Sequence, residues 1–312
     1  MTRLRKNALV IGAAGFLGRS IASMLSMSGW RVRAIDKNSI IETGLDGVEC
    51  LCGNVFDEQF LIRSLKNIDV VYFFFSSLLP SASSENQSNK MLNALSHVLD
   101  KMKECGVEKI VFPSSGGAIY GNVISGSAKE EDMLAPVTIY GAERMECEKF
   151  LARYASLGIS SMILRISNVY GGLSYREVNQ GVIDIFIQKA IMNEEVSVWG
   201  NALTNIRDYI FVDDFTDAVE MISDREFQGF NVYNIGSGVG VSLKEIIGII
   251  NDKMGKPLKV NHAPNDVTDS IERIVLNCNK VTRDFGWRPK YNIEQGIIET
   301  IKRKKRIMEK HI

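Results

Sequence analysis

A tyrosine and an arginine are placed where they could act together in proton transfer. Tyr140 and Arg144 lie near the start of the segment 139–156, whose pattern predicts a long helix. A spacing of four residues puts both side chains on one face of that helix. A phenol is a weak acid at neutral pH, and a fixed cation beside it stabilises the phenolate. The pair is therefore a candidate acid–base centre.

Hydroxyl side chains follow a buried strand that is predicted at 109–112. The segment 113–121 reads PSSGGAIYG, so Ser114 and Ser115 come at the carboxyl end of this strand. Ligands of open α/β sheets bind at the carboxyl ends of the strands. These serines are therefore placed to meet a substrate.

A glycine-rich loop, GAAGFLG at 12–18, joins the first predicted strand to the first predicted helix. Glycines at such a junction allow a tight turn, close approach to a pyrophosphate and close packing of the helix on the sheet. The helix start at Phe16 and Leu17 offers unpaired N–H groups to phosphates. Asp36 ends the next strand, where a carboxylate can bind both ribose hydroxyls and repels a 2′-phosphate. We therefore predict NAD as the cofactor rather than NADP.

Strand and helix patterns alternate through the first half of the chain. Strands are expected at 8–11, 31–35, 48–52, 69–75, 109–112 and 161–166, and helices at 16–28, 57–65, 86–105 and 139–156. This alternation predicts an α/β fold, a doubly wound parallel sheet of the Rossmann type. After Asn168 the pattern loosens, with helices expected at 180–192 and 242–254. We predict a dinucleotide-binding domain at 1–167 and a smaller C-terminal α/β lobe at 168–312, with some segments returning to the first domain.

Composition narrows the class of protein. The 312 residues include 37 basic and 37 acidic side chains, a balance that argues against nucleic acid as the main partner. With 45% hydrophobic residues the chain is neither disordered nor collagen-like. Its five cysteines and three histidines lack metal-site spacing, so no metal is predicted. We see no signal peptide and no apolar run of about 20 residues, and we expect a cytoplasmic protein without membrane contact. The basic run 302–306 is expected to be a solvated helix face.

The motifs together resemble the extended short-chain dehydrogenases/reductases, and among them the NAD-dependent nucleotide-sugar epimerase/dehydratase family, close to the UDP-glucose 4-epimerases. The similarity covers nearly the whole chain. Its landmarks are GAAGFLG at 12–18, GNVFD at 53–57, SSGGAIYG at 114–121, YGAER at 140–144, RISNVYG at 165–171, RDYIFVDD at 207–214, NIGSG at 234–238 and FGWRP at 285–289. The order and spacing of these motifs make a chance similarity very improbable.

The resemblance implies a set of cofactor contacts in the first domain. Asn54 and Val55 match positions against the adenine, and Phe75 and Ser76 match positions at the inner ribose of the cofactor. The cofactor-binding residues implied are Gly12, Gly15, Phe16, Leu17, Asp36, Asn54, Val55, Phe75, Ser76, Tyr140 and Arg144.

The resemblance also implies the catalytic residues. Tyr140 matches the family's catalytic tyrosine, which exchanges a proton with a sugar hydroxyl or ketone while the nicotinamide exchanges hydride with the same carbon. Counting back from Tyr120, the usual Ser/Thr position falls on Gly116, which leaves Ser115 or Ser114 as the hydroxyl donor. We predict Ser115. Arg144 stands where most relatives have lysine; it keeps the charge, but it cannot release a proton.

Substrate contacts follow from the same comparison of motifs. Ser115, Asn168 and Arg207 match positions that contact the nucleotide-diphosphate sugar, and a guanidinium suits phosphate oxygens. Arg273 is a stand-in for a late arginine whose position is occupied here by Asp266. Arg207 has a structural alternative, because a neighbouring aspartate could pair with it.

The leading functional hypothesis is a 4-epimerase of a UDP- or dTDP-linked sugar that serves surface-polysaccharide synthesis, with a homodimer implied by the family. The alternative is an NAD(P)H-dependent 4-ketoreductase of a dTDP- or UDP-4-keto-6-deoxy sugar. The substitutions to Arg144 and Gly116 fit this alternative, because a reductase needs proton delivery in one direction only. A 4,6-dehydratase is disfavoured because no acid pair follows Ser115. A non-catalytic dinucleotide-binding protein is the remaining alternative from a different class.

Overall fold

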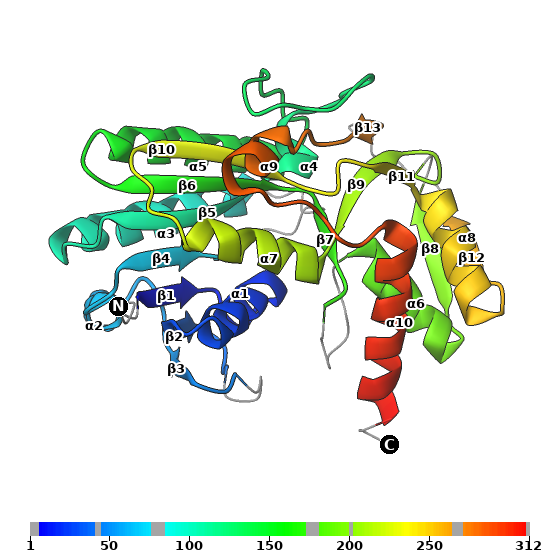
Figure 1. Cartoon of the computed structure of the whole chain (residues 1–312), viewed down its shortest axis with the longest axis horizontal. Coiled ribbons are helices and arrows are strands. Elements are labelled where there is room, and N and C mark those ends of the chain that lie inside the picture. Colours follow the sequence, from blue (N-terminus) through cyan, green and yellow to red (C-terminus); the bar gives the residue numbers. More distant parts are fainter. Residues whose placement is uncertain are drawn as a thin grey trace. The chain divides into compact units, whose positions relative to one another are not determined.

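The computed structural model describes residues 6–40, 45–75, 85–172, 181–199, 202–263 and 271–309 (Figure 1). The strands are β1 (Asn7–Ile11), β2 (Arg31–Asp36), β3 (Val48–Cys52), β4 (Val70–Phe73), β5 (Lys109–Ser115), β6 (Ser160–Ile166), β7 (Asn168–Tyr170), β8 (Glu195–Trp199), β9 (Ile206–Phe211), β10 (Phe230–Ile235), β11 (Gly240–Ser242), β12 (Lys259–Ala263) and β13 (Arg273–Ile274). The helices are α1 (Phe16–Met27), α2 (Glu58–Leu65), α3 (Glu85–Glu104), α4 (Gly116–Ile119), α5 (Ile139–Ala155), α6 (Val182–Met192), α7 (Val212–Ser223), α8 (Leu243–Met254), α9 (Asn279–Phe285) and α10 (Ile293–Glu309).

The chain forms two compact units. Unit 1 consists of Met1–Ser115, Thr138–Arg165 and Val219–Tyr233, and unit 2 consists of Gly116–Val137, Ile166–Ala218 and Asn234–Ile312. The segments 116–137 and 219–233 thus belong to the units opposite to those that a single cut at residue 167 would give them. The second of these segments is a return of the later chain to the first unit.

A seven-stranded sheet has the order β10-β6-β5-β4-β1-β2-β3. β1 pairs in parallel with β2 and β4, β2 pairs in parallel with β3, and β4 with β5. The strands β1, β4 and β5 are almost continuously buried, as expected of parallel strands covered on both faces. The predicted doubly wound α/β fold is confirmed.

The helices of unit 1 bury apolar stripes against this sheet and against each other. α1 contacts β1 and β2 and buries Ile21, Ala22 and Leu25, while α5 contacts both β5 and α3. The contacts of α5 belong to an apolar cluster that includes Leu9 of β1, Phe112 of β5 and residues of α3 and α5. Burial of this surface fixes the carboxyl ends of the strands, where the predicted site lies.

α5 begins at the residue predicted from its pattern. The side chain of Thr138 caps the helix by accepting a hydrogen bond from the Gly141 N–H at 3.0 Å. Unusually for a helix of unit 1, its buried face carries charges, among them Arg144 and Glu148. The Glu148 carboxylate meets the buried Arg165 guanidinium of β6 at 2.7 Å, so this ion pair ties α5 to the sheet.

Unit 2 has smaller sheets. β9 lies between β11 and β13 and also pairs with β7, while β8 pairs with β12. α6, α8 and α10 contact one another, and their apolar residues form a second core cluster together with side chains from β7, β8 and β9. The smaller C-terminal lobe thus has a core of its own.

The basic run on α10, the red helix of Figure 1, is not wholly solvated. Arg303 makes two hydrogen bonds to the Asp213 carboxylate, at 2.9 and 2.6 Å. Lys304 is buried and forms an ion pair with the buried Asp184 at 3.4 Å. The expectation of a solvated face is therefore wrong for these two residues, because the helix turns them toward acids of unit 2.

Across the described ranges, no helix is long and apolar enough to cross a membrane.

Candidate active site

The glycine loop has a backbone that only glycine accommodates at its two critical positions. Gly12 has φ +85°, and a Cβ there would lie 2.5 Å from the carbonyl oxygen of Phe74, the residue after β4. A Cβ on Gly18 would lie 2.3 Å from the Gly12 carbonyl oxygen. The turn therefore packs against both β4 and its own helix, and it leaves the start of α1 at Gly15 without a side-chain cap.

Asp36 ends β2 beside this loop. One carboxylate oxygen accepts a hydrogen bond from the Ala14 N–H at 3.1 Å, and the other accepts from the Asn38 N–H at 2.9 Å. The carboxylate is thus fixed at the rim of the glycine loop, although its partners in this structure are backbone groups.

The residues expected at the adenine lie on the turn between β3 and α2. Asn54 is exposed, and its side-chain oxygen accepts from the Phe56 N–H at 3.1 Å. Val55 is buried in the core cluster of unit 1, and Phe75, two residues after β4, packs against the same cluster. Phe16 is 38% exposed at the start of α1, with Leu17 half-buried beside it. Ser76 lies outside the described residues.

Tyr140 and Arg144 meet on α5 as their spacing predicts. The Cζ atom of Arg144 lies 4.9 Å from the centroid of the Tyr140 ring, so the guanidinium lies over the ring face. Arg144 is only 4% exposed, whereas Tyr140 is half-buried. Arg144 also donates a hydrogen bond to the carbonyl oxygen of Pro113 at 3.0 Å. This bond joins the start of α5 to the end of β5, where Ser115 lies.

The two serines at the end of β5 differ in exposure. Ser114 is 4% exposed, and its hydroxyl has no hydrogen-bond partner among the described residues. Ser115 is half-buried and is the last residue of the strand. The greater exposure of Ser115 is what a group that meets a substrate requires.

The predicted substrate residues Asn168, Arg207 and Arg273 all belong to unit 2. Asn168, at the start of β7, is exposed and donates from its side chain to the carbonyl oxygen of Asp208 at 2.9 Å. Arg273 of β13 donates to the carbonyl oxygens of Val123 and Gly126 at 2.7 and 2.8 Å. Asp266 lies outside the described residues.

Arg207 of β9 has no acidic partner among the described residues, and its guanidinium donates to the carbonyl oxygens of Ile206 and Ile271. Burial lowers the pKa of this guanidinium, because desolvation disfavours the charged form. The structural alternative, an ion pair with a neighbouring aspartate, is not found. Asp213 instead binds Arg303. An anion placed at Arg207 would meet a cation that has no acidic partner in the part of the chain that the structure describes.

The other neighbour, Asp208, serves the architecture of unit 2. It is almost fully buried, and its carboxylate accepts from the backbone N–H groups of Ser237, Gly238 and Leu276 at 2.8 to 3.2 Å. Burial raises the pKa of Asp208, and these hydrogen bonds oppose that rise. The NIGSG motif at 234–238 is thereby joined to β9, which carries Arg207.

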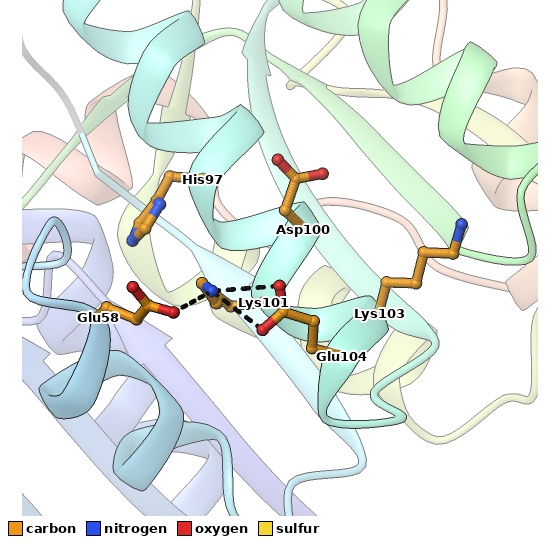
Figure 2. A pocket seen from close by; sticks show the side chains of 6 residues that line it. All are labelled: Glu58, His97, Asp100, Lys101, Lys103 and Glu104. Atoms are coloured by element: carbon orange, nitrogen blue, oxygen red, sulfur yellow. Dashed lines mark hydrogen bonds and ion pairs between the residues drawn. The ribbon is translucent and has the colours of Figure 1, made fainter.

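A charged hollow of about 550 Å³ opens elsewhere on unit 1, beside α3 (Figure 2). Figure 2 shows Lys101 between Glu58 and Glu104, which it binds through its ammonium group. The hollow is lined by Glu58, His97, Asp100, Lys101, Lys103 and Glu104. Its charges largely pair with one another, and none of the residues predicted for the site lines it. In the ranges that the structure covers, no group of three or more His, Cys, Asp or Glu side chains could hold a metal ion.

The residues of unit 1 fit a dinucleotide. The glycine turn leaves no room for a side chain where the backbone must approach a pyrophosphate, and the start of α1 presents N–H groups there. A carboxylate stands at the end of β2, the position that suits ribose hydroxyls. The polar groups at the end of β5 and the start of α5 complete the same edge of the sheet.

The model of the NAD dependent epimerase/dehydratase family matches residues 8–236, and the chain belongs to this family. The resemblance drawn from the motifs is confirmed, and the protein is an NAD-dependent enzyme. It is 29% identical to the dTDP-4-dehydro-6-deoxyglucose reductase of Escherichia coli over 96% of this chain and 98% of that protein. It is also 29% identical to a putative UDP-glucose 4-epimerase of Methanocaldococcus jannaschii, over 93% of this chain and 95% of the relative.

Solved structures of similar fold include UDP-glucose 4-epimerases. The UDP-glucose 4-epimerase of Thermotoga maritima with UDP-glucose matches with a TM-score of 0.85 and 27% identity, over 97% of this chain and 99% of that one. The UDP-glucose 4-epimerase of Thermus thermophilus in complex with NAD matches with a TM-score of 0.84 and 27% identity, over 96% and 99% of the two chains. The predicted cofactor, NAD, is therefore supported by both family and structural relatives.

Sequence reasoning missed one member of the acid–base region. Phe112 of β5 lies 5.7 Å from the Cζ atom of Arg144, measured to its ring centroid. Its place in a buried strand was predicted, but its contact with α5 was not. Phe112 and Arg144 are 32 residues apart in the sequence, so no local pattern could predict their contact.

Proposed function

We propose that this enzyme is a 4-epimerase of a nucleotide-diphosphate sugar carrying UDP or dTDP. The observation that carries the proposal is the contact of Tyr140 with the buried guanidinium of Arg144 on α5. Both residues belong to the same unit as the glycine loop. Full-length similarity to proteins named UDP-glucose 4-epimerase supports this substrate class.

The bound NAD would supply a hydride acceptor and donor at C4 of the sugar. Tyr140 holds the phenol that takes the proton from the C4 hydroxyl, and it returns that proton when the hydroxyl forms again. Arg144 places its guanidinium over the ring of this phenol, so the two groups can act as one unit. Ser115 donates a hydrogen bond to the same sugar oxygen.

The nucleotide-sugar diphosphate would be bound by unit 2. Arg207 offers a half-buried guanidinium without an acidic partner among the described residues, and a diphosphate supplies the missing negative charge. Asn168 and Arg273 contribute further donors from β7 and β13. In the proposed division of labour, residues 1–167 mainly bind NAD and residues 168–312 mainly bind the nucleotide sugar.

A 4-ketoreductase of a dTDP- or UDP-4-keto-6-deoxy sugar is the second candidate. It is favoured by Arg144, because arginine cannot release a proton and so cannot relay one to and from the tyrosine. A reductase tolerates this loss, since it delivers a proton in one direction only. The E. coli relative named dTDP-4-dehydro-6-deoxyglucose reductase agrees with this candidate. For either function we propose a homodimer in the cytoplasm that supplies precursors of a surface polysaccharide.

One incubation separates the candidates. Purified protein is given UDP-glucose in one arm and a dTDP-4-keto-6-deoxy sugar in the other, with and without added NADH or NADPH. Formation of UDP-galactose without added reduced cofactor supports the epimerase. Stoichiometric oxidation of NADH or NADPH with the keto sugar supports the reductase. Absence of turnover in both arms, with NAD shown to be bound, contradicts both functions and leaves a non-catalytic dinucleotide-binding protein.

A further inference from the structure

We propose that Phe112 is a positioning residue for Tyr140 and acts through Arg144. The three side chains form a stack, defined here as the Tyr140 ring, the Arg144 guanidinium and the Phe112 ring. This inference rests on the proposed role of Tyr140 as the group that moves the proton, and it adds a residue of β5 to that role.

Distances place the guanidinium against both rings. Its Cζ atom lies 4.9 Å from the Tyr140 centroid and 5.7 Å from the Phe112 centroid, both within the roughly 6 Å range of a cation–π contact. Its Nη1 atom donates to the Pro113 carbonyl oxygen at 3.0 Å. The guanidinium is therefore held by two consecutive residues of β5 and by the tyrosine one turn before it on α5.

Charge and burial explain why the rings matter. Arg144 is 4% exposed, and no salt bridge among the described residues includes it. Its Nε atom is buried without a hydrogen-bond partner among those residues. A buried cation is costly unless it is compensated, and the groups in contact with this guanidinium include two aromatic rings and one carbonyl oxygen. Loss of either ring should leave the guanidinium poorly held.

Phe112 connects the stack to the core. It is fully buried on β5, and its ring lies 6.2 Å from the ring of Phe73 on β4, with 17° between the planes. A ring fixed in this way limits where the guanidinium can lie, and the guanidinium in turn limits the orientation of the half-buried Tyr140 ring. Tyr140 would thus be preorganised by the sheet.

A lysine at position 144 cannot replace this arrangement. A guanidinium is planar and weakly hydrated, so it can stack on rings while it donates in its plane. An ammonium group has no plane to stack and is strongly hydrated. Arg144→Lys should therefore retain the positive charge and still lose the positioning of Tyr140.

The first test needs no substrate. The protein is labelled with 3-fluorotyrosine, and the ¹⁹F signal of Tyr140 is assigned by its loss in Tyr140→Phe. We expect this signal to move in Phe112→Leu and in Arg144→Lys, while the signal of Tyr154, on the same helix, stays in place. An unchanged Tyr140 signal in folded Phe112→Leu overturns the proposal, whatever reaction the enzyme catalyses.

The second test is a double-mutant cycle with UDP-glucose and, in parallel, a dTDP-4-keto-6-deoxy sugar. Phe112→Leu and Arg144→Lys should each lower kcat about tenfold, the order expected of one desolvated cation–π contact, with little change in KM. The double variant should be no slower than the slower single variant, because both changes break one unit. Multiplicative losses, or a loss in KM alone, contradict a stack.

A matched control removes equal aromatic surface elsewhere. Phe215 of α7 is also fully buried, and Phe215→Leu should lower the thermal midpoint without changing kcat. If Phe112→Leu fails to fold, Arg144→Lys and Arg144→Met test the stack from its central member by the same ¹⁹F signal. Absence of turnover by the wild-type protein contradicts the proposed function. The ¹⁹F result tests the positioning of Tyr140 independently of that outcome.

Discussion

Two places at the carboxyl edge of the same sheet are built on different physical grounds. The glycine loop after β1 is fixed by its backbone, since a Cβ at Gly12 would lie 2.5 Å from the Phe74 carbonyl oxygen. The acid–base region at the ends of β5 and α5 is fixed by side chains, namely the contacts of Arg144 with Tyr140 and Phe112. A backbone requirement restricts the sequence to glycine. A side-chain arrangement can be met by different residues, and here arginine and Gly116 replace the lysine and Ser/Thr that the family resemblance leads one to expect.

The largest expected effect breaks the loop. Gly12→Ala should abolish NAD binding, with a loss in affinity of at least about 100-fold, because the added Cβ meets backbone and φ +85° is strained for alanine. Titration of the purified protein with NAD measures the loss. The control is Gly29→Ala, since Gly29 has φ +84° but no atom within 4 Å of the added Cβ. Equal losses in both variants would mean that backbone strain destabilises the domain as a whole, and that the close approach at Gly12 is not the cause.

The next largest effect lowers the rate of the reaction without changing cofactor binding. Tyr140→Phe should lower kcat by about 10² to 10⁴, the range for loss of a general acid–base, while NAD affinity stays unchanged. Steady-state rates and NAD titration measure the two quantities separately. Tyr154→Phe is the control, because its hydroxyl donates to Asp100 on α3. A near-normal kcat in Tyr140→Phe would contradict the role of Tyr140 as the acid–base group.

A smaller effect concerns the choice of cofactor. Asp36→Asn keeps an acceptor for the Ala14 N–H but removes the negative charge, so the loop should survive. Affinity for NADP should rise about tenfold as repulsion of its 2′-phosphate is lost. Competitive titration of NAD and NADP checks this. If the affinities for NAD and NADP fall together, Asp36 serves the loop rather than the ribose.

The smallest effect lies at the amino edge of the sheet and should leave activity untouched. Glu226 binds Lys6 and Lys109, and these hydrogen bonds lower the pKa of Glu226 from its usual value to about 2. Its contribution to folding stability is therefore complete above about pH 4.5 and is lost as the pH falls toward 2. Since the carboxylate is largely exposed, the contribution should be below about 1 kcal/mol.

Denaturant unfolding of Glu226→Gln at pH 7 and pH 3 measures this contribution. The difference in the free energy of unfolding between wild type and variant should shrink at the lower pH. A difference that grows on acidification would contradict the sign of the pKa shift.

Much of the fold was predictable because its determinants are local. The strand 48–52 and the start of the helix at residue 139 have the predicted bounds, and a capping threonine at position 138 marks the helix start. The end of β5 was not predicted at Ser115, because Pro113 and two serines do not have the composition of a strand.

The candidate site divides in the same way. The roles of Tyr140, Arg144 and Ser115 remain predictions, although the spacing of the first two does place them in contact. The inward orientation of Arg303 and Lys304 could not be read from a basic run, because their acidic partners lie about 90 and 120 positions away in the sequence.

By itself the sequence determined the glycine turn, the order of strands and helices in the first half, and the family, since each rests on residue types at short spacing. Only the tertiary structure decided that Arg144 is buried against two rings, that Arg207 has carbonyl partners and no acidic partner among the described residues, and that segments 116–137 and 219–233 change units. The reason is physical: these features arise from packing between residues remote in the chain, and burial and desolvation depend on every neighbour that the folded chain brings together.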